Sequence, residues 1–183
     1  MVFLNPKRTI LFFQAIGFIL HRNLETVPIV DISSLVQNGS EKDKYKTSMA
    51  VGKALQELGF LYVVNHGIEL SLCDKIMENA TRLFALPDNK KQEIAQEPNS
   101  VRGYVTFGKE KTFKKSDWKE AFYHMTEIDV SNRGGPQVLL SGKNPWPRED
   151  YVPGFEKNYR EYVKKLNELG QTMMSAIAVS LGE

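Results

Sequence analysis

Two glycines and a lysine, Gly103, Gly108 and Lys109, have the spacing of a phosphate-binding P-loop. In that motif a Ser or Thr hydroxyl follows the lysine and coordinates magnesium, but Glu110 stands there in this chain. A carboxylate at that place would repel phosphate groups. The residues before Gly103 are also polar, whereas a P-loop follows a strand. The sequence therefore does not predict a nucleotide site.

Metal binding would have to rest on three histidines, His21, His66 and His124, and on the single cysteine, Cys73. No two of them have a spacing typical of a zinc site. A non-haem iron(II) site takes two histidines and a carboxylate, usually with the acid two positions after a histidine. The residues at those positions are Asn23, Ile68 and Thr126. We therefore expect no metal ligand within this chain.

No catalytic nucleophile is predicted either. Cys73 lies on the apolar stripe of an expected helix, which is typical of a core residue, and there is no Gly-x-Ser-x-Gly elbow. His66 follows a buried strand and precedes Gly67, as a turn histidine bonded to the backbone would. His124 is more typical of a sheet residue with its hydrogen bonds satisfied than of a ligand.

Length and charge limit the remaining classes. A chain of 183 residues is long enough for one ordinary domain. A net charge of +2 is too small to indicate a nucleic-acid partner, and one cysteine cannot form an internal disulfide. A local cluster, Lys109, Lys111, Lys114 and Lys115, is interrupted by Glu110 and followed by Asp117, which predicts a solvated face.

Residues 1–26 are expected to be an extra segment outside the domain. Lys7 and Arg8 precede an apolar run over residues 10–20, which is too short to span a bilayer as a helix. No small-x-small cleavage site follows the run. We expect no transmembrane span and a cytoplasmic location, with a mitochondrial presequence as the alternative.

The elements expected to position any site begin with a strand over 27–32. A capping box of Ser40 and Asp43 then starts a helix that Gly59 ends. Residues 60–64 are apolar throughout, which is typical of a strand covered on both faces. A second capping box at Ser71 and Asp74 predicts a helix ended by Pro87, followed by a short charged helix over 88–96.

The pattern weakens over residues 97–154, where we expect two strands, 101–107 and 118–125, and several loops. A long helix with a wide apolar stripe follows over 155–181. Both this stripe and strand 60–64 require cover, because a soluble monomer rarely exposes a large apolar patch. We infer that a continuation of the chain or a partner protein supplies it.

Several segments, taken in order, resemble one known region. They are Val27–Ile32, Gly59–Ile68, Phe84–Pro87 with Lys90-Lys91, Arg102-Gly103-Tyr104, Asp117–Phe122, Asn144–Pro147 and the long helix. Their order is similar to that of the N-terminal region of the non-haem iron(II), 2-oxoglutarate-dependent dioxygenases, the isopenicillin-N-synthase-like group. The resemblance covers residues 27–183, which we expect to be one dioxygenase N-terminal-type domain.

This resemblance implies an α+β fold, helix-rich with a few short strands and incomplete without a C-terminal double-stranded β-helix. In the family that jelly roll carries the His-x-Asp…His iron ligands and the Arg-x-Ser that holds 2-oxoglutarate. His21 and Arg22 cannot be the family's iron-binding histidine and cosubstrate-binding arginine, because they lie at the wrong end of the chain. No catalytic or metal-binding residue is therefore transferred, and iron(II) and 2-oxoglutarate are implied only for the full-length enzyme.

The resemblance does suggest substrate-proximal residues, because the Arg-Gly-Tyr segment lies near the mouth of the active site in such enzymes. Arg102 and Tyr104 are the candidates. We expect an oxidoreductase portion that is inactive alone and acts on a small molecule once its jelly roll is present. The alternative is a non-catalytic interaction module that docks a protein partner through its exposed apolar face.

Overall fold

A computed structural model describes residues 10–13, 27–98, 100–127 and 142–183. The chain divides into two compact units, one of residues 1–77 with 160–183 and the other of residues 78–159. We call them unit 1 and unit 2. Two helices, α3 (Leu70–Phe84) and α5 (Phe155–Leu181), each contribute residues to both units. Each unit is described by itself.

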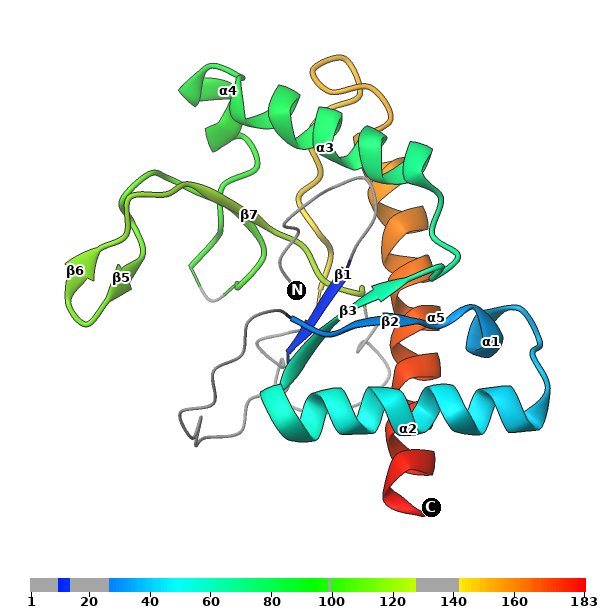
Figure 1. Ribbon diagram of the computed structural model, residues 1–183. Helices are drawn as coiled ribbons and strands as arrows, with labels where there is room; N and C mark the ends of the chain where they lie inside the picture. The colour runs from blue at the N-terminus through cyan, green and yellow to red at the C-terminus, as the bar shows by residue number, and fades with distance from the viewer. Residues whose placement is uncertain (1–9, 14–26, 99, 128–141) are drawn as a thin grey trace, which may run out of the picture. The chain divides into compact units, whose positions relative to one another are not determined.

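Unit 1 contains a three-stranded sheet with the order β1 (Ile10–Phe13), β3 (Phe60–Val64), β2 (Ile29–Asp31) (Figure 1). Strand β1 runs antiparallel to β3, and β2 runs parallel to it. In the central strand Leu61 and Val63 are fully buried and their neighbours are half-buried. The expected strands 27–32 and 60–64 are thus present. Strand β1 falls within residues 1–26, where no strand was expected.

The helices of unit 1 follow the local signals closely. After the short helix α1 (Ser33–Val36), helix α2 (Glu41–Leu58) begins where Ser40 Oγ accepts a hydrogen bond from the Asp43 amide at 3.2 Å. Gly59 ends the helix at a φ of 83°, a conformation that costs glycine little. Both ends of α2 confirm the prediction.

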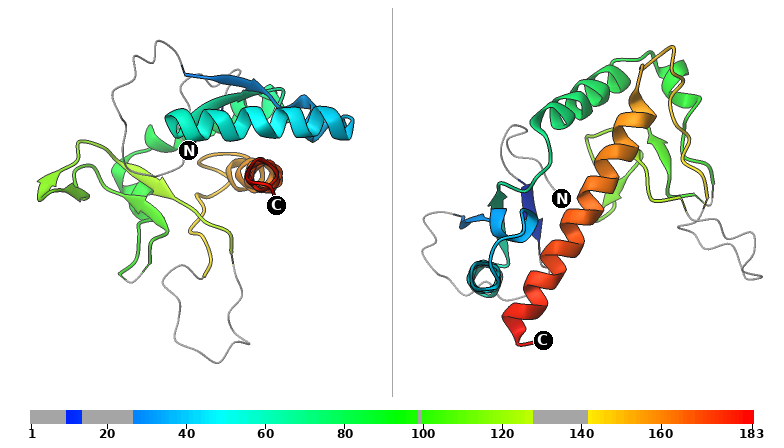
Figure 2. Two further views of the ribbon diagram at one scale, coloured as in Figure 1. Left: turned by 60° about the horizontal axis from the view of Figure 1, so that its bottom comes forward. Right: turned by 90° about the vertical axis from the view of Figure 1, so that its right-hand side faces the viewer.

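Helix α2 and the C-terminal part of α5 approach closely within unit 1. A Cβ atom placed on Gly52 would lie 2.4 Å from Ser180 Oγ, so only glycine allows this approach. Figure 2 shows the two helices crossing near the end of the chain.

Helix α5 has the bounds expected of it, Phe155–Leu181. Its stripe is buried at Phe155, Tyr162, Leu169, Met173 and Ala176. Its exposed large apolar residues are Met174, Val179 and Leu181. Tyr159, Val163, Leu166 and Ile177 of the same stripe are half-buried.

Unit 2 contains helix α4 (Asp88–Gln92), the antiparallel pair β4 (Gly103–Val105) and β7 (Ala121–Tyr123), and a hairpin of β5 (Lys111–Thr112) and β6 (Lys115–Ser116). Its core cluster is formed by Leu83, Ile94, Tyr104, Val152 and Phe155. The two expected strands are present but shorter than predicted.

Two predictions, for helices α3 and α4, were wrong. Helix α3 begins at Leu70, because the amides of Leu72 and Cys73 donate to the Glu69 carbonyl, so Ser71 lies inside the first turn and does not cap it. Helix α4 ends at Gln92 and does not continue to 96. The following residues pair instead with Tyr104, whose amide donates to the Ile94 carbonyl at 2.8 Å.

Within the described ranges, no helix combines the length and the hydropathy needed to cross a bilayer.

Candidate functional site

The predicted Arg-Gly-Tyr segment leads into strand β4, and its glycine determines how the strand is placed. Gly103 has a φ of 112°, and a Cβ atom there would lie 2.8 Å from the Ile94 carbonyl oxygen. Glycine therefore lets β4 lie between β7 and residues 94–96, which bond to Tyr104 from the other side. This close packing holds Arg102 and Tyr104 in the interior of unit 2.

Arg102 is 1% exposed, and oxygen atoms of the chain surround its guanidinium. Nη1 donates to the Met125 carbonyl at 3.0 Å and to Asn144 Oδ1 at 2.8 Å, and Nη2 donates to the Thr126 carbonyl at 3.0 Å. A buried cation is tolerated where such oxygens replace its water shell. Arg102 therefore fixes the backbone of residues 125–126.

Asn144 completes this arrangement from the expected Asn-Pro-Trp-Pro loop. Its amide Nδ2 donates to the Met125 carbonyl at 2.8 Å, and its Oδ1 accepts from the Met125 amide at 2.9 Å. Its own backbone amide donates to Glu127 Oε1 at 2.7 Å. Two segments named in the resemblance, 102–104 and 144–147, thus converge on residues 125–127. The importance of Asn144 itself was missed, although its motif was noticed.

Tyr104 is 2% exposed and belongs to a second polar cluster. Its hydroxyl donates to Glu120 Oε2 at 2.6 Å, and the buried Lys91 ammonium donates to the same oxygen at 2.8 Å. Lys91 also lies 3.2 Å from Asp88 Oδ1. We call these four residues the Lys91 cluster. Sequence reasoning had noted Lys91 and Glu120 only as parts of longer segments.

The charges of the Lys91 cluster shift one another's proton affinities. The hydrogen bond to Glu120 raises the pKa of Lys91 above its ordinary value. Burial alone would raise the pKa of Glu120, but the bonds from Lys91 and Tyr104 outweigh it and lower that pKa. Burial, followed by the bond to Glu120, raises the pKa of Tyr104. Lysine and glutamate therefore stay ionised and the phenol stays protonated at neutral pH.

The histidines lie in different surroundings. His124 follows β7 and packs against aromatic rings, with centroids 4.9 Å from Tyr159 and 5.5 Å from Trp146. Burial lowers the pKa of His124, and the charge of Arg102 lowers it further. His66 Nδ1 accepts a hydrogen bond from the Ile68 amide at 3.2 Å, which confirms the predicted turn histidine. Cys73 is buried, as predicted. His21 lies outside the described residues.

The described residues do not supply a donor set for iron. Within those ranges, no three His, Cys, Asp or Glu side chains gather in a way that could hold a metal ion. The Lys91 cluster offers two carboxylates, but a lysine ammonium occupies the space between them.

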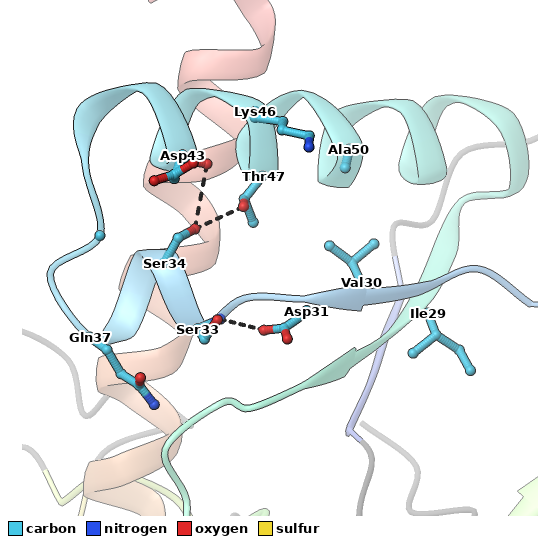
Figure 3. A pocket seen from close by; sticks show the side chains of 11 residues that line it. Ile29, Val30, Asp31, Ser33, Ser34, Gln37, Asp43, Lys46, Thr47 and Ala50 are labelled. Atoms are coloured by element: carbon cyan, nitrogen blue, oxygen red, sulfur yellow. Dashed lines mark hydrogen bonds between the residues drawn. The ribbon is translucent and has the colours of Figure 1, made fainter.

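A separate open pocket of about 620 Å³ lies in unit 1 between β2, α1 and α2 (Figure 3). Some of its polar groups bond to other residues that line it. Ser34 Oγ lies 2.8 Å from Thr47 Oγ1, and Asp31 accepts from the Ser33 amide at 2.8 Å. The hydrogen bond that the Ser33 backbone amide donates also lowers the pKa of Asp31. The pocket is an open hollow at the surface, and the residues that line it do not include a nucleophile with a neighbouring base.

Comparison with known proteins identifies the family. Residues 27–149 match the family model described as non-haem dioxygenase in morphine synthesis, N-terminal. The chain belongs to this family.

Curated relatives agree with the family model. The chain is 30% identical over 161 residues to a 1-aminocyclopropane-1-carboxylate oxidase of Dictyostelium mucoroides, a match that covers 87% of this chain and 43% of that protein. It is also 30% identical over 198 residues to a homoarginine-6-hydroxylase of Arabidopsis thaliana, covering 100% of this chain and 54% of the relative. The chain thus spans about half the length of these relatives.

Solved structures share the fold. A full-length Neurospora crassa protein in complex with alpha-KG and thymine has a TM-score of 0.65 at 28% identity, over 85% of this chain and 48% of that one. A 2OG-Fe(II) oxygenase family protein of Caulobacter crescentus has a TM-score of 0.69 at 22% identity, over 86% and 49%. The α+β class is confirmed, and the chain represents about half of these folds.

Proposed function

We propose that this chain is the N-terminal, non-metal-binding portion of an iron(II)- and 2-oxoglutarate-dependent oxidoreductase that acts on a small molecule. The observation that carries the proposal is the family match over residues 27–149. The partial coverage of relatives and solved structures supports it, because about half of each lies beyond the matched part. The iron and the cosubstrate would be bound by a jelly-roll domain that these 183 residues do not include.

In such an enzyme, iron(II) and 2-oxoglutarate bound by the other domain would supply the activation of dioxygen for oxidation of the substrate. The role of this chain is structural support and substrate positioning. Arg102 and Tyr104 remain the candidates for the substrate-proximal side. Because three oxygens of the chain already bond the Arg102 guanidinium, its contribution would be to hold residues 125–127 in place. It would not serve as the primary anchor of a substrate anion.

The first test is an anaerobic calorimetric titration of the 183-residue chain with iron(II) and, separately, with 2-oxoglutarate. We expect no binding at micromolar concentrations, because the ligand set is assigned to another domain. A micromolar Kd for either compound would contradict the division of labour proposed here.

The second test is the transcript beyond codon 183. We expect the frame to continue and to encode His-x-Asp, a later His and Arg-x-Ser. The protein expressed from the full frame should release succinate from 2-oxoglutarate in an iron-dependent manner, and the 183-residue chain should not. A stop codon directly after Glu183 would count against the proposal.

The alternative, a non-catalytic module that docks through an exposed apolar face, gains no support from the comparisons. On helix α5 the exposed large apolar residues are Met174, Val179 and Leu181.

A further inference from the structure

The hairpin of β5 and β6 projects from unit 2 as an arm and ends in a bulky apolar residue (Figure 1). Thr112 pairs with Lys115, so Phe113 and Lys114 form a two-residue turn. Their φ angles are 49° and 68°, values that Asn-Gly usually adopts in such turns. Phe113 is 96% exposed. The turn thus places an aromatic ring in solvent, in a backbone conformation that is strained for it.

On one face of this hairpin the acidic side chains form ion pairs with a neighbouring lysine. Lys119 Nζ lies 2.9 Å from Glu110 Oε2 and 3.8 Å from Asp117 Oδ2. Thr112 Oγ1 donates to Asp117 Oδ2 at 3.1 Å, and the Tyr123 hydroxyl donates to Glu110. Both acidic residues between positions 109 and 119 are therefore held on this side.

Within the hairpin, Lys111 points to the opposite side from Thr112, because side chains alternate along a strand. Lys109 and Trp118 lie just outside the two strands and are exposed, as Lys111 is. Lys109 and Lys111 flank Glu110, and Trp118 lies between Asp117 and Lys119. Trp118 is 89% exposed. With the turn residues they form what we call the basic–aromatic face: Lys109, Lys111, Phe113, Lys114 and Trp118. Among the described residues no carboxylate forms an ion pair with its three lysines. The solvated lysine cluster predicted from sequence therefore has its unpaired lysines apart from the two acidic residues.

We propose that the basic–aromatic face docks this protein onto an anionic phospholipid surface. Aromatic rings favour the boundary between headgroups and acyl chains, and lysines are attracted to anionic leaflets. A flat membrane surface can contact the rings of Phe113 and Trp118, five residues apart, and the lysines around them at the same time. A single-stranded nucleic acid instead needs a groove with rings on which successive bases stack, and these two-residue strands form none.

The test is co-sedimentation of the 183-residue protein with vesicles of phosphatidylserine and phosphatidylcholine, with pure phosphatidylcholine vesicles and an oligothymidylate as comparators. We expect binding to the anionic vesicles that weakens as sodium chloride rises, since salt screens the lysines. Trp118 emission should shift to the blue on binding, and Trp118→Phe should abolish the shift. No binding to anionic vesicles at low salt would overturn the proposal, as would tighter binding to the oligonucleotide.

Three variants test the face itself. Phe113→Asn should weaken vesicle binding at least about ten-fold while leaving the thermal midpoint equal or higher, because asparagine tolerates the turn. Lys111→Gln should weaken binding about five-fold, the effect of one lysine near an anionic leaflet. Lys115→Gln removes the same charge from the opposite face and should have a clearly smaller effect. Equal effects of the two lysine variants would overturn the assignment of the face, and so would dimerisation that depends on Phe113.

Discussion

The two units of this protein are stabilised by different interactions. Unit 1 relies on apolar residues at helical or strand spacing, such as Val51, Leu61 and Val63, with caps at both ends of α2. Unit 2 also has an apolar cluster, but it contains both of the buried charged residues that the structure describes, Lys91 and Arg102. Burial of apolar surface is non-directional, whereas a buried charge requires oxygens at defined positions. The fold of unit 2 should therefore depend more on individual polar residues, and single substitutions of these residues should destabilise it more.

The largest expected effect is that of Arg102→Ala. It removes a buried cation together with the hydrogen bonds that its guanidinium donates to the Met125 and Thr126 carbonyls and to Asn144 Oδ1. We expect a loss of about 3 kcal/mol or more in the free energy of unfolding. Urea denaturation with hydrogen exchange, followed by mass spectrometry of peptides from each unit, should place the loss in unit 2. The matched control is Arg148→Ala, an exposed ion pair with Asp150, and it should change little. Equal effects would remove the contrast between the units.

Leu61→Ala tests the apolar unit in the same way. Leu61 is fully buried in the central strand, so the truncation leaves a cavity and should cost about 2–4 kcal/mol. Exchange protection should fall in peptides of residues 27–69 and not in those of 100–125. The exposed Ile29→Ala in the neighbouring strand is the control and should have little effect. A uniform loss of protection over both peptide groups would show that the units unfold as one.

Glu120→Gln tests the Lys91 cluster and carries a pH signature. The variant leaves Lys91 buried with only Asp88 as a charged partner, and we expect a loss of about 2 kcal/mol at pH 7. Because the folded state lowers the pKa of Glu120, the stabilisation is present above the ordinary value of about 4.3 and is lost as pH falls through the folded value. The wild-type and variant curves should converge in acid. Parallel curves would contradict the role of the ionised carboxylate, and Glu78→Gln, in an exposed pair, is the control.

The smallest expected effect comes from the two described histidines, one in each unit. Burial lowers the pKa of both His66 and His124, so the unfolded chain binds more protons between the folded values and about 6.5. Stability should be complete above pH 6.5 and fall as pH decreases through that window. His124→Phe should remove the dependence in unit 2 exchange alone, and His66→Asn should do so in unit 1. A variant that flattened both profiles would contradict this separation.

The candidate site shows why sequence alone located some residues and missed others. Gly103 was noticed for a P-loop spacing that proved irrelevant, yet its positive φ is what lets β4 lie against residues 94–96. Arg102 and Tyr104 were named from a resemblance, and their contact with a substrate stays a prediction. Asn144 and Glu120 lie 42 and 29 positions from Arg102 and Lys91, and no local pattern joins residues so far apart.

By itself the sequence determined the bounds of α2 and α5, the central strand β3, the turn role of His66 and the family. These depend on spacing within a few residues or on the order of motifs. Only the tertiary structure decided how far α4 extends, which oxygens surround Arg102 and Lys91, and on which side of the hairpin the charges lie. The reason is physical, because a helix cap or an apolar stripe is completed by near neighbours, whereas a buried charge is stabilised only by groups that folding brings from distant parts of the chain.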